Sequence, residues 1–121
     1  MKFQSRNRLQ RPADFRAVFT QASHRISANG YVVLARSNNL PESRLGFALA
    51  KKKVKRATDR NSARRLHREC FRLLVAPELK GYDFVVVFAR NVTDRTFKNH
   101  HSMRNIQPLW TKLPQTLPSL G

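Results

Sequence analysis

The sequence predicts an α+β domain of the α/β-sandwich type, in which a small, mostly antiparallel sheet contains one parallel βαβ unit and is flanked by helices. The chain of 121 residues is long enough for one domain with a buried core and too short for two. Hydrophobic residues make up 40% of it, which is enough for folding. Strand-like apolar segments lie on both sides of a long stretch with helical periodicity.

The N-terminal region is polar and basic over residues 1–11, which we expect to form a loose arm. Pro12 stands where a helix can begin without losing a needed hydrogen bond, and the helix is expected to run from Ala13 to Gln21. Residues 22–29 are polar and are expected to form a loop.

Three later segments have the composition of strands. Gly30–Arg36 is the first, and Arg44–Ala50 is expected to run antiparallel to it, with Gly46 marking a bulge or a close approach of the backbone. Tyr82–Ala89 is apolar at both alternating positions from Phe84 onward, so it should be central and covered on both faces. With the helix between them, the second and third strands form a βαβ unit, for which a right-handed crossover is the default.

That helix is expected to run from Thr58 to Leu74, and its outer face is strongly basic. Ten of the 22 residues from Lys51 to Arg72 are Lys or Arg. At 100° per residue the cationic stripe consists of Arg56, Arg60, Arg64, Arg68 and Arg72, with Asn61 and Arg65 at its edge. The apolar side consists of Ala63, Leu66, Cys70, Leu73 and Leu74. Thr58 or Asp59 can cap the start of this helix, and Pro77 lies beyond its end.

Two interpretations of the stripe are open. A charged helix face is usually a solvated face. Here nearly all the charges have one sign, and like charges one turn apart repel each other by a few tenths of a kcal/mol. The net charge of +17 and the pI of about 11.7 produce a field that attracts phosphate backbones. We therefore favour a polyanionic partner.

The C-terminal region has a helical pattern of apolar residues that follows Asp94, its expected N-cap, and continues to Leu113. Pro108 removes one hydrogen bond of this helix, so a kink or a break is expected there. The folded domain should therefore span residues 12–113, with residues 114–121 as a disordered tail.

Phe15 and Phe19 lie one turn apart on the first predicted helix, and two roles are open for them. Phe residues tend to be buried, which favours a place in the core. Alternatively, the two rings form a platform on which unpaired bases stack. The residue pattern alone does not decide between these roles.

The sequence favours a binding protein over a catalyst. Nucleases usually need clustered carboxylates for metal ions or paired histidines, and the seven acidic residues here are scattered. His67 and Cys70 have a spacing that one metal ion could bridge, but there is no second pair of this kind. We therefore expect no catalytic and no metal-ligating side chain. The single cysteine fits a reducing, cytoplasmic location, and no apolar run approaches the ~20 residues that span a membrane.

Residues 44–52 (RLGFALAKK) and 57–72 (AxxRNxxRRLxRExFR) resemble the protein subunit of bacterial ribonuclease P and its RNR motif. Further matching pieces follow in order: RL at 8–9 with DFxxVF at 14–19, YDFVVV at 82–87 with AR at 89–90, and LWxKL at 109–113. The resemblance covers residues 8–113, and the central motif is its most specific part.

The resemblance implies a protein that assists a catalytic RNA, which removes the 5′ leader of precursor tRNA by magnesium-dependent hydrolysis. Mg²⁺ would be held mainly by the RNA, and none by protein side chains alone. The implied partners are ribonuclease P RNA, in a 1:1 complex, and precursor tRNA, with no membrane and no obligate protein partner. The family also has a left-handed βαβ crossover, which replaces the default above.

The resemblance also assigns roles to residues. Those implied to bind the catalytic RNA are Lys51, Lys52, Arg60, Asn61, Arg64, Arg65 and Arg68, to which we add Lys53 and Arg56 from the same basic stretch. Phe15 and Phe19 are implied to bind the leader. The sequence departs from the family pattern at Ser62, Ala63, Leu34 and Pro108. Of these, Leu34 replaces a residue that is aromatic in some relatives, so it puts a leader contact in doubt.

Composition alone would equally suit a basic structural RNA-binding protein, such as a ribosomal component, with no processing role. A DNA-binding helix module is disfavoured, because no helix-turn-helix pair is visible in the pattern. A nuclease that acts without RNA is the remaining alternative.

Overall fold

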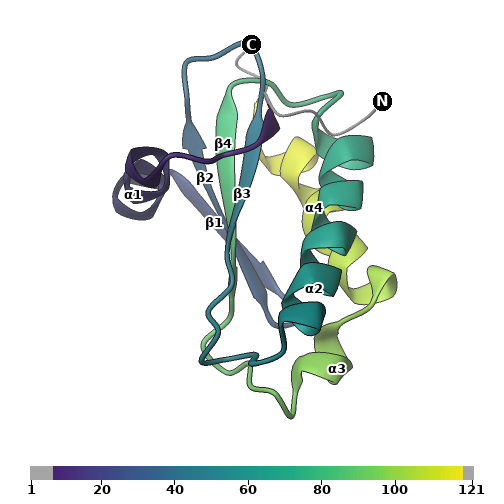
Figure 1. Cartoon of the computed structure of the whole chain (residues 1–121). Helices are drawn as coiled ribbons and strands as arrows, with labels where there is room; N and C mark the ends of the chain where they lie inside the picture. Colours follow the sequence, from purple (N-terminus) through teal and green to yellow (C-terminus); the bar gives the residue numbers. More distant parts are fainter. Residues whose placement is uncertain (1–6, 119–121) are drawn as a thin grey trace.

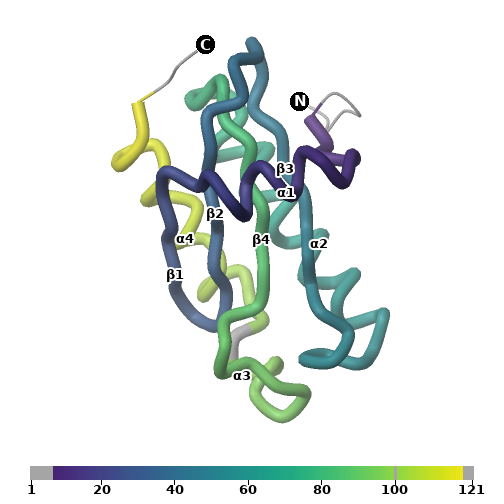
Figure 2. The backbone as a smooth tube through the Cα atoms, turned by 90° about the vertical axis from the view of Figure 1, so that its left-hand side faces the viewer, coloured from purple at the N-terminus to yellow at the C-terminus, as the bar shows by residue number. Residues whose placement is uncertain are grey.

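A computed structural model, which describes residues 7–118 apart from the side chain of His100, has three layers. A four-stranded sheet lies between α1 on one face and α2 and α4 on the other (Figures 1 and 2). The helices are α1 (Pro12–Gln21), α2 (Ala57–Cys70), its π-helical continuation η2 (Phe71–Val75), α3 (Phe97–His100) and α4 (Met103–Thr116). The strands are β1 (His24–Ala28), β2 (Tyr31–Ser37), β3 (Arg44–Ala48) and β4 (Tyr82–Phe88).

The sheet is mixed, with the strand order β1-β2-β4-β3. β1 pairs antiparallel with β2 and β2 with β4, whereas β3 and β4 are parallel. The predicted α+β class with a parallel βαβ unit is therefore confirmed. β3 runs antiparallel to β2, as predicted, but β4 lies between them. The central position predicted for β4 is also correct, because all its residues except Val87 are buried.

The loop predicted at residues 22–29 is wrong, because His24–Ala28 form the edge strand β1. Its inward residues, Ile26 and Ala28, pack against the core and alternate with exposed polar ones. The turn to β2 is Asn29-Gly30, with φ values of 51° and 87°. Two left-handed residues in sequence are the geometry of a tight hairpin, and Asn-Gly is its sequence signal. The polar composition of the segment concealed this hairpin.

The crossover from β3 through α2 to β4 is left-handed. Both strands run in the same direction, and α2 returns along the face of the sheet opposite α1 (Figures 1 and 2). Seen with α2 in front and the strands pointing up, β4 lies to the left of β3. The default right-handed rule therefore does not hold here, and the handedness implied by the resemblance does.

The main core lies between the sheet and the two long helices. Trp110 of α4 is fully buried and donates its indole N–H to Nδ1 of His67 on α2 over 2.8 Å. The His67 ring also packs edge-on against Tyr31, with ring centres 4.4 Å apart. Burial and, to a smaller extent, the charge of His101 together lower the pKa of His67 from 6.5 to about 3. His67 and the buried Cys70, the pair with a metal-like spacing, are thus core side chains.

The C-terminal helical region divides at His101–Ser102 and not at Pro108. Ser102 Oγ accepts the Asn105 amide over 3.2 Å and caps α4, whereas the predicted cap Asp94 accepts the amide of Lys55. α4 continues through Pro108, which lies on its exposed side. The buried side of α4 carries Ile106, Leu109, Trp110 and Leu113. Burial of this apolar stripe outweighs the loss of one hydrogen bond on the solvent side.

The predicted disordered tail begins too early. α4 extends to Thr116, Leu117 is buried, and the Tyr82 hydroxyl donates to the carbonyl of Pro118 over 2.7 Å. The prediction is therefore wrong for residues 114–118, while residues 119–121 lie outside the described part. None of the helices within residues 7–118 has the length and apolar composition to span a membrane.

The predicted loose N-terminal arm is also wrong where the structure describes it. Asn7 and Leu9 are buried. The Leu9 amide donates to the Leu45 carbonyl over 2.9 Å, and Asn7 Nδ2 donates to the carbonyl of Ser43 over 3.0 Å. Residues 7–9 therefore lie along the edge of β3, and residues 1–6 of the predicted arm fall outside the described part.

The buried state of His67 predicts a pH-dependent stability. Between pH 6.5 and 3 the unfolded chain binds a proton at His67 that the folded chain does not bind. The free energy of unfolding should therefore decrease as the pH is lowered, by up to about 1.4 kcal/mol per pH unit. His67→Gln can still accept the Trp110 hydrogen bond without titrating. Urea unfolding between pH 7 and 4 should show a shallower pH dependence for this variant. Parallel curves for the two proteins would contradict the assignment.

Candidate nucleic-acid interface

α2 presents the predicted cationic stripe on the face turned away from the core. Its inner face is buried through Ala63, His67 and Cys70. The helix begins at Ala57 with Arg56 in the N-cap position, and no side chain makes a capping bond there, so the predicted caps Thr58 and Asp59 are wrong. The wider turn of η2 leaves Leu73 exposed, although the helical pattern placed it on the apolar side.

Most of the predicted RNA-binding residues are accessible. Lys51, Lys52, Arg56, Asn61 and Arg65 are exposed, and Lys53, Arg60, Arg64 and Arg68 are half-buried. Arg64 Nη1 donates to Asn61 Oδ1 over 2.7 Å. Within residues 7–118 no carboxylate lies within salt-bridge distance of Arg64 or Arg68, and the ion pairs belong to Arg44 and Arg72. The positive charge of the stripe is therefore mostly not neutralised by the protein.

The turn before α2 is held in place by two of these cations. Arg60 Nη1 donates to the carbonyls of Val54 and Lys55 over 2.7 and 2.8 Å. Lys53 Nζ donates to the carbonyl of Arg90 over 2.8 Å. Both side chains have a structural role, and their predicted contacts with RNA stay predictions.

Phe15 and Phe19 lie on α1, on the opposite face of the sheet (Figure 1). Val18 is fully buried and attaches α1 to a small second core with Leu9 and Val85. Phe19 is 48% exposed and Phe15 is half-buried. The core interpretation is therefore wrong for Phe19, whereas Phe15 contributes to packing and to the surface.

An apolar strip of the sheet continues from these two rings. The strand register aligns Leu34, Val85 and Gly46 in one row and Val32, Val87 and Ala48 in the next. Leu34, Val87 and Ala48 are half-buried, so α1 does not seal this face. The exposed ring of Phe19 and the half-buried ring of Phe15 lie beside this apolar surface, which suits the stacking of unpaired bases. Leu34 supplies apolar area to this strip without an aromatic face.

Arg44 holds α1 in position. Its Nε and Nη2 atoms bind the two carboxylate oxygens of buried Asp83 over 2.8 and 2.7 Å, and Nη1 reaches Asp14 of α1 over 3.5 Å. Hydrogen bonding to Asp83 raises the pKa of Arg44. Asn38 Nδ2 also donates to Asp83 over 2.8 Å, so the buried carboxylate is well satisfied. This ion pair fixes the start of α1 relative to the sheet.

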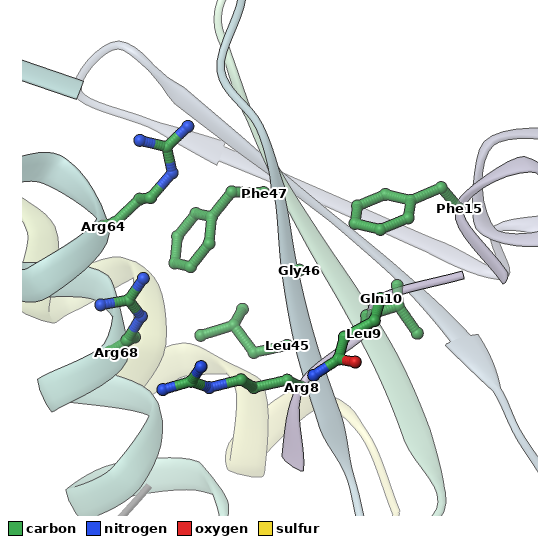
Figure 3. Close-up of a pocket in the computed structure, with 9 residues that line it drawn as sticks. All are labelled: Arg8, Leu9, Gln10, Phe15, Leu45, Gly46, Phe47, Arg64 and Arg68. Atoms are coloured by element: carbon green, nitrogen blue, oxygen red, sulfur yellow. The ribbon is translucent and has the colours of Figure 1, made fainter. Parts of the chain in front are cut away.

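An open pocket of about 250 Å³ lies at the outer edge of β3, between the cationic face of α2 and the apolar face that carries α1 (Figure 3). The described lining of the pocket contains three cationic residues from two segments of the chain, Arg8, Arg64 and Arg68. Burial, followed by the charges of Arg8 and Arg64, lowers the pKa of Arg68. Positive charge therefore converges on this pocket from α2 and from the segment that precedes α1.

Sequence reasoning missed Arg8, Arg44 and Phe47 as parts of this region. Arg8 belongs to the segment predicted to be loose, and its apolar neighbour Leu9 was the available signal for docking. The alternation through Leu45 and Phe47 could have placed both side chains on the face toward α2. The pairing of Arg44 with Asp83 depends on strand register, which this sequence alone does not specify.

These features define a class of protein. A basic α+β domain with an arginine-rich helix face and a separate aromatic, apolar surface is suited to bind structured RNA through its backbone and unpaired nucleotides through their bases.

Comparisons with known proteins narrow this class to one family. Residues 3–114 match the family model Ribonuclease P. The chain is 41% identical over 105 residues to the ribonuclease P protein component of Histophilus somni (strain 2336), covering 87% of this chain and 85% of that one. It is 39% identical over 111 residues to that of Chromohalobacter salexigens, covering 92% and 84%.

Solved structures agree with this result. The RNase P protein from Thermotoga maritima, in complex with 1-(4-fluorophenyl)-2-thiourea, has a TM-score of 0.74 and 29% identity over 91% of this chain and 99% of that one. The Staphylococcus aureus RNase P protein has a TM-score of 0.68 at 23% identity, covering 85% and 87%, and shows the likeness of the fold alone.

The chain belongs to the bacterial ribonuclease P protein family. It is a subunit of a ribonucleoprotein endonuclease that removes the 5′ leader of precursor tRNA, and catalysis rests with the RNA subunit. Ribonuclease P RNA and precursor tRNA are its partners. These comparisons favour the processing subunit over the ribosomal, DNA-binding and RNA-independent nuclease alternatives.

The close contact at Gly46 predicts that a methyl group added at this position disturbs the packing of α1 against β3. A Cβ atom at this position would lie 2.7 Å from Phe15 Cζ and 2.9 Å from Leu9 Cβ, and the second atom cannot swing away. Gly46→Ala should therefore lower the free energy of unfolding by about 1–3 kcal/mol. Urea unfolding in a Phe15→Ala background should show a smaller cost, because one of the two clashes is gone. The same cost in both backgrounds would contradict the packing described.

Proposed function

We propose that α2 and the turn before it bind ribonuclease P RNA. The observation that carries this proposal is the row of accessible arginines without carboxylate partners among residues 7–118. The proposed contacts are Lys51, Lys52, Arg56, Asn61, Arg64, Arg65 and Arg68, with Lys53 and Arg60 also holding the turn. Guanidinium groups bind phosphate through two parallel hydrogen bonds, which suits RNA recognised by its backbone.

The leader of precursor tRNA is proposed to bind on the opposite face of the sheet. Phe15, Phe19 and the half-buried Leu34 provide adjacent apolar surface there. The leader is single-stranded, so its bases are free to stack on the rings of α1. One domain would thus hold the catalytic RNA on one side and the substrate on the other.

Mg²⁺ is proposed to be held mainly by the RNA. Within residues 7–118 no three His, Cys, Asp or Glu side chains lie together as a metal site, Asp14 and Asp83 both face Arg44, and Asp94 accepts a backbone amide. Mg²⁺ prefers oxygen ligands and often binds phosphates. The cationic surface would reduce the repulsion between RNA phosphates and so favour the folded RNA that holds the ion.

A 1:1 complex with the RNA, without an obligate protein partner, is proposed. One chain carries both the cationic face of α2 and the apolar face beside α1, and its own core holds both in place. A cytoplasmic location is proposed because precursor tRNA is the substrate in a bacterial cell.

The proposed leader site predicts a selective effect of Phe19→Ala. Phe19 is exposed, so stability should change by less than about 0.5 kcal/mol. Loss of one stacked base should weaken binding of leader-bearing precursor by about 1–3 kcal/mol and leave binding of leaderless tRNA unchanged. Affinities are measured with the reconstituted ribonucleoprotein. Leu40→Ala, which removes an apolar side chain exposed in the β2–β3 loop, is the matched control. Equal losses for both substrates would place Phe19 outside the leader site.

A further inference from the structure

The pocket at the outer edge of β3 combines concentrated positive charge with an apolar floor (Figure 3). Arg64 and Arg68 stand one turn apart on α2, and Arg8 comes from the segment that is hydrogen-bonded to Leu45. Within residues 7–118 the guanidinium of Arg68 has neither a carboxylate partner nor a hydrogen-bond acceptor. Like charges at this spacing repel, so an anion that enters the pocket is attracted by all three groups.

The floor of the pocket is formed by β3. Leu45 and Phe47 both point from the strand toward α2 (Figure 3). Phe47 is half-buried, and the guanidinium carbon of Arg68 lies 5.7 Å from the centre of its ring. An inorganic anion would gain nothing from an aromatic floor. A nucleotide would use both parts, because its phosphate meets the guanidinium groups and its base meets a ring and a guanidinium plane.

The shape of the pocket favours an unpaired nucleotide. A space of about 250 Å³ is small and concave. In an A-form duplex the bases are stacked inside the helix, and the phosphates lie on its convex outer surface. Recognition of bases on aromatic and arginine planes occurs at loops, bulges and ends, where nucleotides are free to turn outward.

The position of the pocket favours the catalytic RNA over the leader. Arg64 and Arg68 belong to the same helix face as the exposed Arg65. Phe15 reaches the pocket from the opposite side of β3, across Gly46 (Figure 3). The cationic wall is therefore continuous with the surface proposed for ribonuclease P RNA.

We propose that this pocket holds one unpaired nucleotide of ribonuclease P RNA, with its phosphate on Arg8, Arg64 and Arg68 and its base against Phe47. The proposal rests on the proposed role of α2 and adds a site of single-nucleotide size to it. It differs from a general cationic surface because it requires an unpaired base.

The test measures binding of the full-length protein to three short RNAs by fluorescence anisotropy at constant salt. The probes are a uridine tetranucleotide, a tetranucleotide whose ribose units carry no bases, and a hairpin duplex. Arg68→Gln and Arg8→Gln should each lower affinity for the uridine tetranucleotide about tenfold. Phe47→Leu should lower it about fivefold and leave affinity for the base-free probe unchanged.

Arg65→Gln is the matched control, because Arg65 is exposed on the same helix and does not line the pocket. It should lower affinity for the tetranucleotide by less than about threefold and affinity for the duplex as much as Arg68→Gln does. Arg8 is exposed, so Arg8→Gln keeps the test valid if Phe47→Leu alters the fold. Equal effects of Arg65→Gln and Arg68→Gln on the tetranucleotide, or of Phe47→Leu on both tetranucleotides, would overturn the proposal.

Reconstituted ribonuclease P identifies the source of the nucleotide. Arg8→Gln and Phe47→Leu should weaken binding of the catalytic RNA and leave the preference for leader-bearing precursor unchanged. A change of that preference, with binding of the catalytic RNA unaltered, would assign the pocket to the leader and overturn this proposal. If Arg65→Gln together with Arg56→Gln leaves the affinity for the catalytic RNA unchanged, the proposed role of α2 fails independently of the pocket.

Discussion

The packing of the inner face of α2 against the core is the contact on which the RNA-binding surface depends. Trp110 donates its indole N–H to His67 inside the core, and burial keeps the His67 ring neutral at ordinary pH. These contacts, together with the buried Ala63 and Cys70, fix the orientation of the helix. Because helix position is set from the inside, the outer face is free to carry arginines at a spacing that is unfavourable in an isolated helix. The stability of the core thus supports a charged surface on which Arg60 also holds the turn before α2, whereas Arg56 and Arg65 are exposed on the helix.

β3 relates this surface to the one on the opposite face of the sheet. Leu45 and Phe47 point toward α2, whereas Arg44 and Gly46 face α1. A register shift of one residue would exchange these two sets of side chains, so the parallel pairing with β4 determines both surfaces together. Arg44 holds α1 by an ion pair, and Gly46 leaves room for the ring of Phe15. The edge strand β3 therefore fixes the positions of α1 and α2 relative to each other.

The strands β2, β3 and β4 and the helix α2 were predictable because their hydrophobic periodicity is long and clear. β1 was not, because its alternation is carried by few apolar residues in a polar segment. The break predicted at Pro108 is absent from α4. The rule for proline considers only the local helix, whereas burial of the apolar side of α4 is a tertiary effect. The cationic stripe of α2, in contrast, could be predicted from helix geometry. The bonds of Arg60 to backbone carbonyls depend on the shape of the turn before α2, and the approach of Arg8 to the pocket depends on contacts between distant segments. Hydrophobic periodicity reports neither.

The most direct measurement is the salt dependence of affinity for ribonuclease P RNA in a variant with Arg56, Arg64 and Arg65 all changed to glutamine. If each of these arginines neutralises one phosphate, the logarithmic slope should become shallower by roughly 2–3, at about 0.7–0.9 per contact. Urea unfolding of the same variant should give a midpoint equal to or higher than that of the unmodified protein, because like-charge repulsion along α2 is relieved. An unchanged salt slope, or a variant that no longer folds, would contradict the account.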